Sequence, residues 1–338
     1  MNVSSASIDA TRSPTSVLLG IEIGGTKLQL VVGDDHGNII DRHRFVIDVK
    51  RGAASILETM ERQIAQLKAL HHIIGTGVGY GGPVNWRTGR IVRSYHIAGW
   101  DGFELGTWLR ERTGTPVLVD NDANVAALAE ARCGQAKSFE SMVYVTLGSG
   151  VGAGFVTGGK IFHGAIPGEL ELGHIQLSEG GLTVQQRCSG WAVDAIVREA
   201  VHASPASELA QQWRAMGMAD PGPAQGGEAK CLAAALSRQC PQARAILDDT
   251  MKALALALSH VVHLLHPHAI TIGGGLSLIG DPLIESLRTA LPHYLMDAFL
   301  PGPHLALASL GEDVVPVGAL LLASSLRGTN ASFTQVNG

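Results

Sequence analysis

Two short glycine turns, each containing a hydroxyl side chain, are the segments of this sequence best suited to bind phosphate. The first is Gly24-Gly25-Thr26, followed by Lys27, and the second is Gly148-Ser149-Gly150. Glycine allows the backbone to approach a ligand closely, and a hydroxyl or an ammonium group donates hydrogen bonds to anionic oxygens. These turns predict a site for the phosphates of a nucleotide.

The residues after the first turn indicate which kind of phosphate site this is. Residues 27–32 alternate and end in β-branched side chains, so the chain continues as a strand. A P-loop or a dinucleotide-binding fingerprint opens a helix after its glycines instead. A second turn at 34–38, a strand at 39–49, a helix at 53–70 and a strand at 73–78 complete the predicted order βββαβ.

The pattern occurs twice, because residues 145–150 align without gaps on residues 21–26, and residues 151–157 match residues 27–33. One glycine hairpin alone is often purely structural, but the gap-free repeat indicates an ATP cleft between two duplicated halves. This is the actin-like, ribonuclease-H-like α/β architecture, with duplicated βββαβα domains and an interdomain active-site cleft.

A third glycine cluster, Gly273-Gly274-Gly275, ends a predicted strand that follows a buried helix at 254–265. Glycine at this place lets an adenine ring lie on the backbone. A plain strand-to-helix turn explains the cluster equally well.

Six segments together closely resemble the ROK family of bacterial sugar kinases, repressors and open reading frames. The resemblance runs from about Leu18 to Ala323. Residues 20–27 and 147–152 are similar to its two phosphate motifs, 77–84 and 98–100 to its sugar-side loop and the segment after it, 119–124 to its catalytic motif, and 171–174 to its sugar-binding and zinc-entry motif. In combination these motifs are highly specific.

The resemblance implies that Asp122 is the base that accepts the proton of the sugar's primary hydroxyl, as phosphoryl transfer to an alcohol requires. Asp122 lies between a strand at 117–119 and a helix at 123–132, where an aspartate also commonly caps the helix. Asn121 matches the sugar-hydroxyl ligand, with a turn-forming asparagine as the alternative. Glu171 matches the acid whose two oxygens suit a vicinal diol. On the sugar side the resemblance also implies roles for Gly82 and His174.

ATP and Mg²⁺ are the implied cofactors. Their predicted ligands are Gly24, Gly25, Thr26, Lys27, Gly148, Ser149, Gly150, Gly273, Gly274 and Gly275. Glu22 stands where the family usually has aspartate, and its extra methylene moves the carboxylate by about 1.5 Å. A metal contact through water absorbs such a shift. Lys27 is interpreted as neutralising phosphate charge, with an exposed strand lysine as the alternative.

The largest departure from the family is in the zinc loop. Of the usual cysteines only Cys188 is present in residues 183–194, and a structural zinc needs about four ligands. We therefore predict no structural zinc and no other metal site. His174 is expected either to contact the sugar or to be a core histidine, and packing by Trp191 is expected to hold the loop. The nearest acid to the family's last sugar-contacting glutamate is Asp194.

The composition sets further limits. The chain has 338 residues, a formal net charge of −5, 46% hydrophobic and 16% charged residues. It shows no basic patch of the density that nucleic-acid binding needs. Its most hydrophobic stretch is too short to span a bilayer, and its four separated cysteines predict reduced thiols in the cytoplasm. The expected partners are a small sugar, no nucleic acid and no membrane, with a homodimer implied by the resemblance.

The predicted organisation is a disordered leader at 1–16, an N-terminal α/β domain at 17–121, a C-terminal α/β domain at 122–325 and a flexible tail at 326–338. A variable helical insertion at 203–245 is expected on the surface of the second domain. The final helix, at about 315–325, is expected to pack back on the first domain.

The predicted function is ATP-dependent phosphorylation of a hexose, with glucose first and N-acetylmannosamine, N-acetylglucosamine or fructose behind. A sugar-binding protein without kinase activity is a second alternative, suggested by the altered zinc loop and Glu22. A regulator is disfavoured because only about 17 residues precede the first motif. An actin-like ATPase without a sugar leaves Asn121–Asp122 and Glu171–His174 unexplained.

Overall fold

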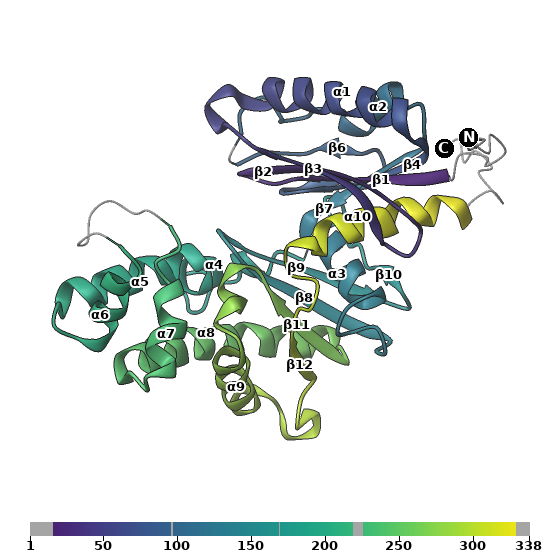
Figure 1. The fold of residues 1–338 in the computed structure, drawn as a ribbon. Helices are drawn as coiled ribbons and strands as arrows, with labels where there is room; N and C mark the ends of the chain where they lie inside the picture. Colours follow the sequence, from purple (N-terminus) through teal and green to yellow (C-terminus); the bar gives the residue numbers. More distant parts are fainter. Residues whose placement is uncertain (1–15, 96, 169, 219–225, 329–338) are drawn as a thin grey trace, which may run out of the picture. The chain divides into compact units, whose positions relative to one another are not determined.

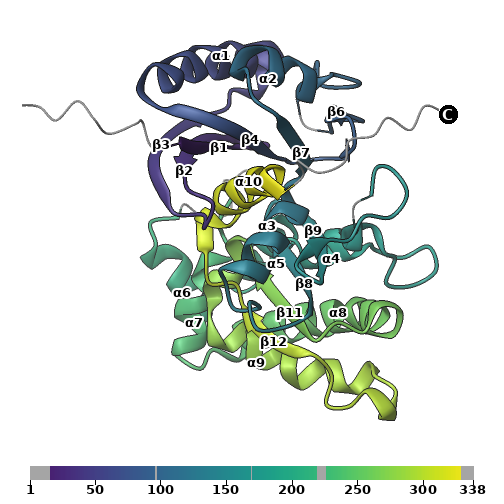
Figure 2. The same cartoon turned by 90° about the vertical axis from the view of Figure 1, so that its right-hand side faces the viewer.

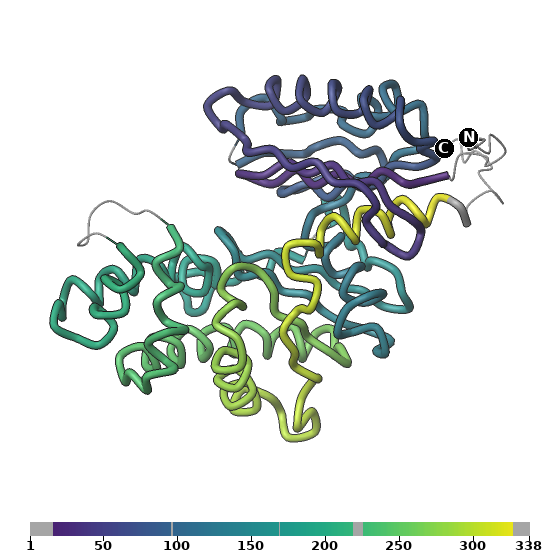
Figure 3. The backbone as a smooth tube through the Cα atoms, in the orientation of Figure 1, coloured from purple at the N-terminus to yellow at the C-terminus, as the bar shows by residue number. Residues whose placement is uncertain are grey.

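The computed structural model describes residues 16–95, 97–168, 170–218 and 226–328. The chain divides into two compact units. The first ends at Asp120 and resumes at Ala319, and the second runs from Asn121 to Gly318. The chain therefore passes from the first unit to the second and back again, as its path in Figure 3 lets the reader follow.

The first unit is built on a five-stranded sheet with the order β3-β2-β1-β4-β7. β1 pairs antiparallel with β2 and parallel with β4, and β2 pairs antiparallel with β3. The strands are β1 (Ser16–Ile23), β2 (Lys27–Gly33), β3 (Ile39–Val46), β4 (His72–Tyr80) and β7 (Val117–Asn121), with a separate small hairpin of β5 (Val84–Asn85) and β6 (Arg90–Ile91).

Helices cover both faces of this sheet. The side chains of β1 are apolar on both faces, so each face must be buried. Leu19 and Ile21 share a core cluster with Ile56 and Met60 of α1 (Gly52–Leu70). Figures 1 and 2 show α1 and α2 (Leu105–Thr113) over this face, and the last turns of α10 (Val314–Ser324) against the other. On that other face Leu18 packs with Leu320 and Ala323.

The second unit repeats the arrangement. Its sheet has the order β10-β9-β8-β11-β12, so the third, second, first, fourth and fifth strands lie side by side in both units. The strands are β8 (Ser141–Leu147), β9 (Val151–Thr157), β10 (Lys160–Ile161), β11 (Ala269–Gly273) and β12 (His304–Leu307). This repeat confirms the predicted duplicated α/β fold.

The two units differ in what joins their third and fourth strands. The first unit has the short η1 (Val49–Arg51) and α1 there. The second has η2 (Leu172–His174), α4 (Val184–Cys188), α5 (Gly190–Ala203), α6 (Glu208–Ala215), α7 (Lys230–Ser237) and α8 (Pro241–Leu265). Its other helices are α3 (Asp122–Arg132), η3 (Gly275–Ile279), α9 (Asp281–Ala290), η4 (Leu291–Tyr294), η5 (Asp297–Phe299) and η6 (Gly311–Asp313), and η7 (Ser325–Gly328) follows α10.

Several boundaries differ from the predicted ones. The strand predicted to reach residue 49 ends at Val46, where η1 follows. The described part of the segment 203–245 contains α6, α7 and the start of α8, and residues 219–225 lie outside the described residues. Its helices are nevertheless not a surface addition, because Leu209, Trp213 and Leu232 are buried in the core of the second unit. Ser16, predicted in the leader, belongs to β1, and residues 1–15 and 329–338 lie outside the described residues.

Close backbone packing holds α10 in each unit. A Cβ added to Gly318 would collide with the carbonyl oxygen of Val125 in α3, within the second unit. A Cβ added to Gly77 of β4 would collide with the carbonyl oxygen of Ala319, within the first. Two consecutive residues of one helix are thus each packed on a different unit.

Candidate active site

Asn121 and Asp122 lie where β7 ends and α3 begins. The side-chain carbonyl of Asn121 accepts hydrogen bonds from the backbone N–H groups of Ala123 at 2.9 Å and Asn124 at 3.3 Å. Asn121 is therefore the N-cap of α3, and Asp122 is its first helical residue. This corrects the alternative interpretation of Asp122 as the cap. Asp122 lies in the first turn of the helix, directly after the residue that supplies the cap.

Two glycines of β9 support the first turn of α3. A Cβ on Gly152 would lie 3.3 Å from the Cβ of Ala123, and one on Gly154 would lie 2.8 Å from the Cα of Asn124. The helix therefore lies directly on the strand. The position of Asp122 is set by this contact, which the local sequence does not reveal.

The first glycine turn is closed by a hydrogen bond from the Gly24 N–H to the carbonyl oxygen of Lys27 at 2.9 Å. Nζ of Lys27 lies 3.1 Å from Oε1 of Glu22, so this lysine forms an ion pair instead of being only an exposed strand residue. Thr26 is exposed at the tip of the turn, beside Gly25.

Glu22 is buried, with 8% of its surface exposed. Its Oε2 accepts a hydrogen bond from Nε2 of Gln29 at 2.6 Å. Burial raises the pKa of Glu22, and Lys27, Gln29 and Arg44 partly oppose that rise. The structure thus places a desolvated carboxylate, with a cation beside it, at the start of the first turn.

The second glycine turn is held by more distant parts of its unit. Gly148 donates to the carbonyl oxygen of Gly150 at 3.0 Å and accepts from the Gly190 N–H at 2.7 Å. The side-chain carbonyl of Gln185 in α4 accepts from the Val151 N–H at 3.2 Å. Ser149 is exposed at the tip, as Thr26 is in the first turn.

The third glycine cluster lies next to the second turn. A Cβ on Gly274, whose φ is +81°, would lie 2.6 Å from the backbone nitrogen of Leu147. At Gly273 the ring of Tyr144 fills the space that a side chain would take, whereas a Cβ on Gly275 would meet nothing within 4 Å. Close packing therefore explains Gly273 and Gly274, and only Gly275 of the three opens onto free space.

Glu171 and His174 flank η2, with Oε2 and Nε2 3.8 Å apart. Their side chains are 50% and 67% exposed, so the interpretation of His174 as a core residue is wrong. A Cβ on Gly173 would collide with the carbonyl oxygen of Val151 at the start of β9. Within the second unit, β9 therefore contacts η2, the second glycine turn and the first turn of α3. Gly82, packed on the ring of Tyr80, belongs to the first unit.

Hydrogen bonds and burial hold the segment that stands in place of the zinc loop. Thr183 and Gln186 form a capping box at the start of α4. Cys188 is buried and donates through Sγ to the carbonyl oxygen of Thr250 at 3.5 Å, and burial raises the pKa of Cys188 to about 12. Cys188 is thus a buried core thiol in this structure. Among the described residues, no three or more His, Cys, Asp or Glu side chains gather as a metal site.

One expectation for this segment is wrong. Trp191 does not hold it by packing, because 58% of its surface is exposed. The apolar buried face of α5 is formed by Val193, Val197 and Val201, and Trp191 is turned about 200° away from Val193. Asp194, the nearest acid to the family's last sugar-contacting glutamate, is buried and accepts from the N–H groups of Gly227 and Ala229 at 2.8 and 2.6 Å, so it supports a loop.

Each unit separately carries groups that fit part of Mg·ATP. In the first unit, Thr26 has an exposed hydroxyl and Glu22 supplies carboxylate oxygens with Lys27 beside them. In the second unit, Ser149 has an exposed hydroxyl and the backbone at Gly275 is open. Mg²⁺ binds oxygen ligands and keeps several waters, so one carboxylate together with substrate phosphates suffices for it. Glu22 and Lys27 would hold the metal–phosphate group.

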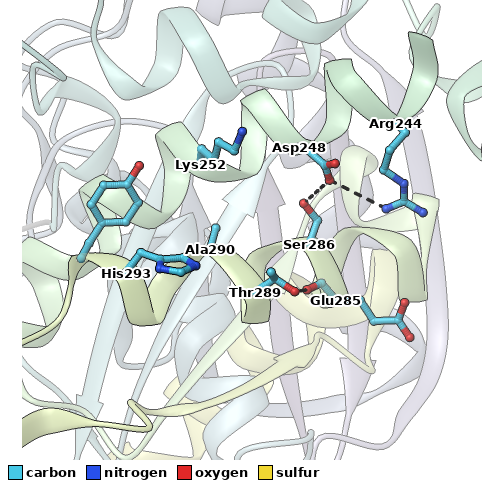
Figure 4. A pocket seen from close by; sticks show the side chains of 9 residues that line it. Arg244, Asp248, Lys252, Glu285, Ser286, Thr289, Ala290 and His293 are labelled. Atoms are coloured by element: carbon cyan, nitrogen blue, oxygen red, sulfur yellow. Dashed lines mark hydrogen bonds and ion pairs between the residues drawn. The ribbon is translucent and has the colours of Figure 1, made fainter. Parts of the chain in front are cut away.

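A separate pocket of about 490 Å³ lies between α8, α9 and η4 in the second unit, and none of the predicted site residues lines it. Figure 4 shows Arg244, Asp248 and Ser286 at one end of it. Ser286 donates to Asp248 at 2.7 Å and Arg244 lies 3.8 Å from the same oxygen, so these polar groups satisfy one another.

The sequence profile of the ROK family matches residues 18–325, and this chain belongs to the ROK family. It is 30% identical over 314 residues to a glucokinase of Halalkalibacterium halodurans, across 89% of this chain and 92% of the relative. A ROK family glucokinase from Streptomyces griseus, solved with glucose and AMPPNP, is 27% identical with a TM-score of 0.79, covering 91% of this chain and 99% of that one. The ROK hexokinase of Thermus thermophilus is 27% identical with a TM-score of 0.73, covering 93% and 100%.

No helix in the described part of the chain is both long and apolar enough to cross a membrane.

Proposed function

We propose that this chain is an ATP-dependent hexose kinase that phosphorylates the primary hydroxyl of glucose, with Asp122 as the general base. The arrangement of Asn121 and Asp122 carries the proposal. Because Asn121 caps α3, Asp122 occupies the first helical position, at the junction between β7 and the helix. In phosphoryl transfer to an alcohol, a positioned aspartate commonly serves as the base for the hydroxyl proton.

In the proposed reaction Asp122 accepts the proton of the sugar hydroxyl as the hydroxyl oxygen attacks the γ-phosphorus of ATP. The new O–P bond forms as the bond between the γ-phosphorus and the bridging oxygen breaks, and ADP leaves with that electron pair. Asn121 and Glu171 orient the sugar, with Glu171 accepting from neighbouring hydroxyls. Exclusion of water from the reacting groups would prevent transfer of the phosphoryl group to water.

The two glycine turns bind the phosphates in this proposal. Thr26, Ser149 and the backbone amides donate hydrogen bonds to phosphate oxygens, and Lys27 neutralises part of their charge. A magnesium ion held at Glu22 would offset the negative charge of the transferring group. The open backbone at Gly275 is the proposed position for the adenine ring.

Glucose is the first choice because the relative from Halalkalibacterium halodurans and the structure from Streptomyces griseus are both glucokinases. N-acetylmannosamine, N-acetylglucosamine and fructose remain alternatives, because the family's last sugar-contacting glutamate has no clear equivalent here and the nearest acid, Asp194, binds the backbone of a loop. We also infer a cytoplasmic homodimer without structural zinc.

The test is an ADP-release assay across about ten hexoses and amino sugars. The proposal expects glucose to give the highest kcat/KM. If turnover is highest with an amino sugar or fructose, that sugar replaces glucose as the proposed substrate, and the proposed kinase activity stands. Sugar binding without ADP release for every compound would instead support the sugar-binding alternative without kinase activity.

A further inference from the structure

Arg44, Gln29 and Glu22 form one row across three neighbouring strands of the first sheet. The register places Glu22 of β1 opposite Gln29 of β2, and Gln29 opposite Arg44 of β3. Directly opposite side chains on one face of an antiparallel pair are close enough to interact. The row ends at Glu22, two residues before the first glycine turn.

The chemistry of this row fixes the direction of its central amide. Nε of Arg44 donates to Oε1 of Gln29 at 2.5 Å. A guanidinium group has donors and no acceptor, so the amide oxygen of Gln29 must face Arg44 and the amide nitrogen must face Glu22. Nε2 of Gln29 then donates to Oε2 of Glu22 at 2.6 Å. Arg44 thus determines which end of Gln29 the carboxylate meets.

Burial makes this contact consequential. Gln29 is fully buried and Glu22 is 8% exposed, and a buried carboxylate is costly unless its oxygens are bonded. Lys27 forms an ion pair with Oε1 at 3.1 Å, and Gln29 donates a hydrogen bond to Oε2. Both oxygens of Glu22 therefore have a partner, and the carboxylate is held in one orientation.

We propose that Gln29 and Arg44 are positioning residues that hold the Glu22 carboxylate at the first glycine turn for the magnesium–phosphate group of ATP. This inference rests on the proposed function. It also accounts for glutamate at position 22. An aspartate would be shorter by about 1.5 Å and would withdraw from Gln29, so the residue types at positions 22 and 29 are matched.

A double-mutant cycle tests the match, using Glu22→Asp, Gln29→Ala and the two together. Each single change is expected to lower kcat/KM for Mg·ATP about tenfold and to raise the free Mg²⁺ needed for half-maximal rate, while KM for the sugar is unchanged. The double variant is expected to be no worse than either single one, because both remove the same contact. Effects that multiply in the double variant would overturn the proposal.

Equilibrium binding provides a readout that does not depend on turnover. A non-hydrolysable ATP analogue is titrated calorimetrically with and without Mg²⁺. Gln29→Ala is expected to lose most of the gain in affinity that Mg²⁺ gives the wild-type protein, while its affinity without Mg²⁺ stays within about twofold. An unchanged Mg²⁺-dependent gain would contradict the positioning role.

Substitutions on β3 supply the matched controls. Arg44 is exposed on this edge strand, so Arg44→Gln tests the row in a protein that still folds even if Gln29→Ala does not. Arg44→Lys keeps a donor and is expected to recover part of the loss. Arg42→Gln changes the same residue type two positions along β3, opposite Val31, and is expected to behave as wild type.

The outcomes separate the two proposals. If the wild type phosphorylates a sugar but Arg44→Gln and Gln29→Ala keep its Mg²⁺ dependence, only the positioning role fails. If the wild type neither turns over ATP with any sugar nor binds the analogue, the proposed function fails and this inference fails with it.

Discussion

The side-chain carbonyl of Gln185 accepts a hydrogen bond from the backbone N–H of Val151 at 3.2 Å, joining α4 to the second glycine turn. A Cβ on Gly150 would lie 2.6 Å from the same Gln185 oxygen. The segment that replaces the zinc loop is therefore in contact with the turn proposed to bind phosphate. The Gln185 side chain therefore both accepts a hydrogen bond from the turn and leaves no room for a side chain at position 150.

Gln185→Ala is expected to raise KM for ATP about fivefold, since one hydrogen bond contributes about 1 kcal/mol net. Steady-state kinetics at saturating sugar would measure it. Gln186→Ala is the control on the same helix, because it removes the capping box of α4 and should lower Tm without changing KM for ATP. Equal KM values for wild type and Gln185→Ala would show that the tether is dispensable.

Asp122→Asn is expected to lower kcat by at least ~10²-fold, the usual scale for losing a general base. Sugar affinity, measured by calorimetry, should stay close to that of the wild type because the two side chains have nearly the same size. Asp281→Asn makes the same change in the first turn of α9 and should leave kcat unaltered. Near-wild-type turnover in Asp122→Asn would rule out the proposed mechanism.

Gly154→Ala is expected to lower kcat by about tenfold or more, since a displacement of about 1 Å at a reacting group can cost 10²-fold. The new methyl group would push on Asn124 and Ala123 and shift the start of α3. Gly164→Ala is the matched control, because a Cβ there meets nothing within 4 Å. Unchanged kcat in Gly154→Ala would mean that β9 does not set the position of Asp122.

Glu22→Gln is expected to raise Tm at pH 7 to 8 in the absence of nucleotide, although it should abolish efficient use of Mg·ATP. Burial raises the pKa of Glu22 above its ordinary value of 4.5, so the folded state binds this proton more tightly than the unfolded state. The penalty for charging Glu22 is therefore present above the folded-state pKa. It disappears as the pH falls below 4.5.

Thermal unfolding of the wild type and Glu22→Gln from pH 4 to 8 would measure this effect. The Tm advantage of the variant should shrink steadily toward acid pH. A variant that is less stable than the wild type at pH 8 would show that Lys27 and Gln29 outweigh the cost of burial.

Removal of metal is expected to leave the fold unchanged. Elemental analysis of the purified protein should find far less than one zinc per chain, and a strong chelator should not alter Tm in the absence of nucleotide. The physical reason is that Cys188 is a buried thiol bonded to Thr250 and His174 is exposed. One tightly bound zinc ion per chain would refute the prediction that the protein has no structural zinc.

The parts of the site that were predicted from the sequence are those with a local signal. Strand alternation around paired glycines predicts both turns, and their gap-free repeat predicts the duplicated fold. A strand followed by a helix places Asp122 at a junction. The sequence offered Asp122 as a possible helix cap, whereas Asn121 is the cap, and a one-residue shift of the helix start separates the two.

The contacts that were not predicted join residues distant in sequence. Gln185 is 34 positions from Val151, and the Gln29–Arg44 pair depends on the register of two strands. No local pattern encodes either contact. Trp191 shows the opposite error, because hydrophobicity suggested burial whereas its angle on α5, away from Val193, leaves it exposed.

The chain returns to its first unit at Ala319, and this return affects the order in which the two units can complete their folding during synthesis. Leu18 and Val31 pack against Leu320 and Ala323, which are synthesised after the whole of the second unit. The second unit is continuous from Asn121 to Gly318 and has all of its residues earlier. The unit that is made first is therefore completed last, and a nascent chain that stops before Leu320 keeps an apolar face of its first sheet uncovered.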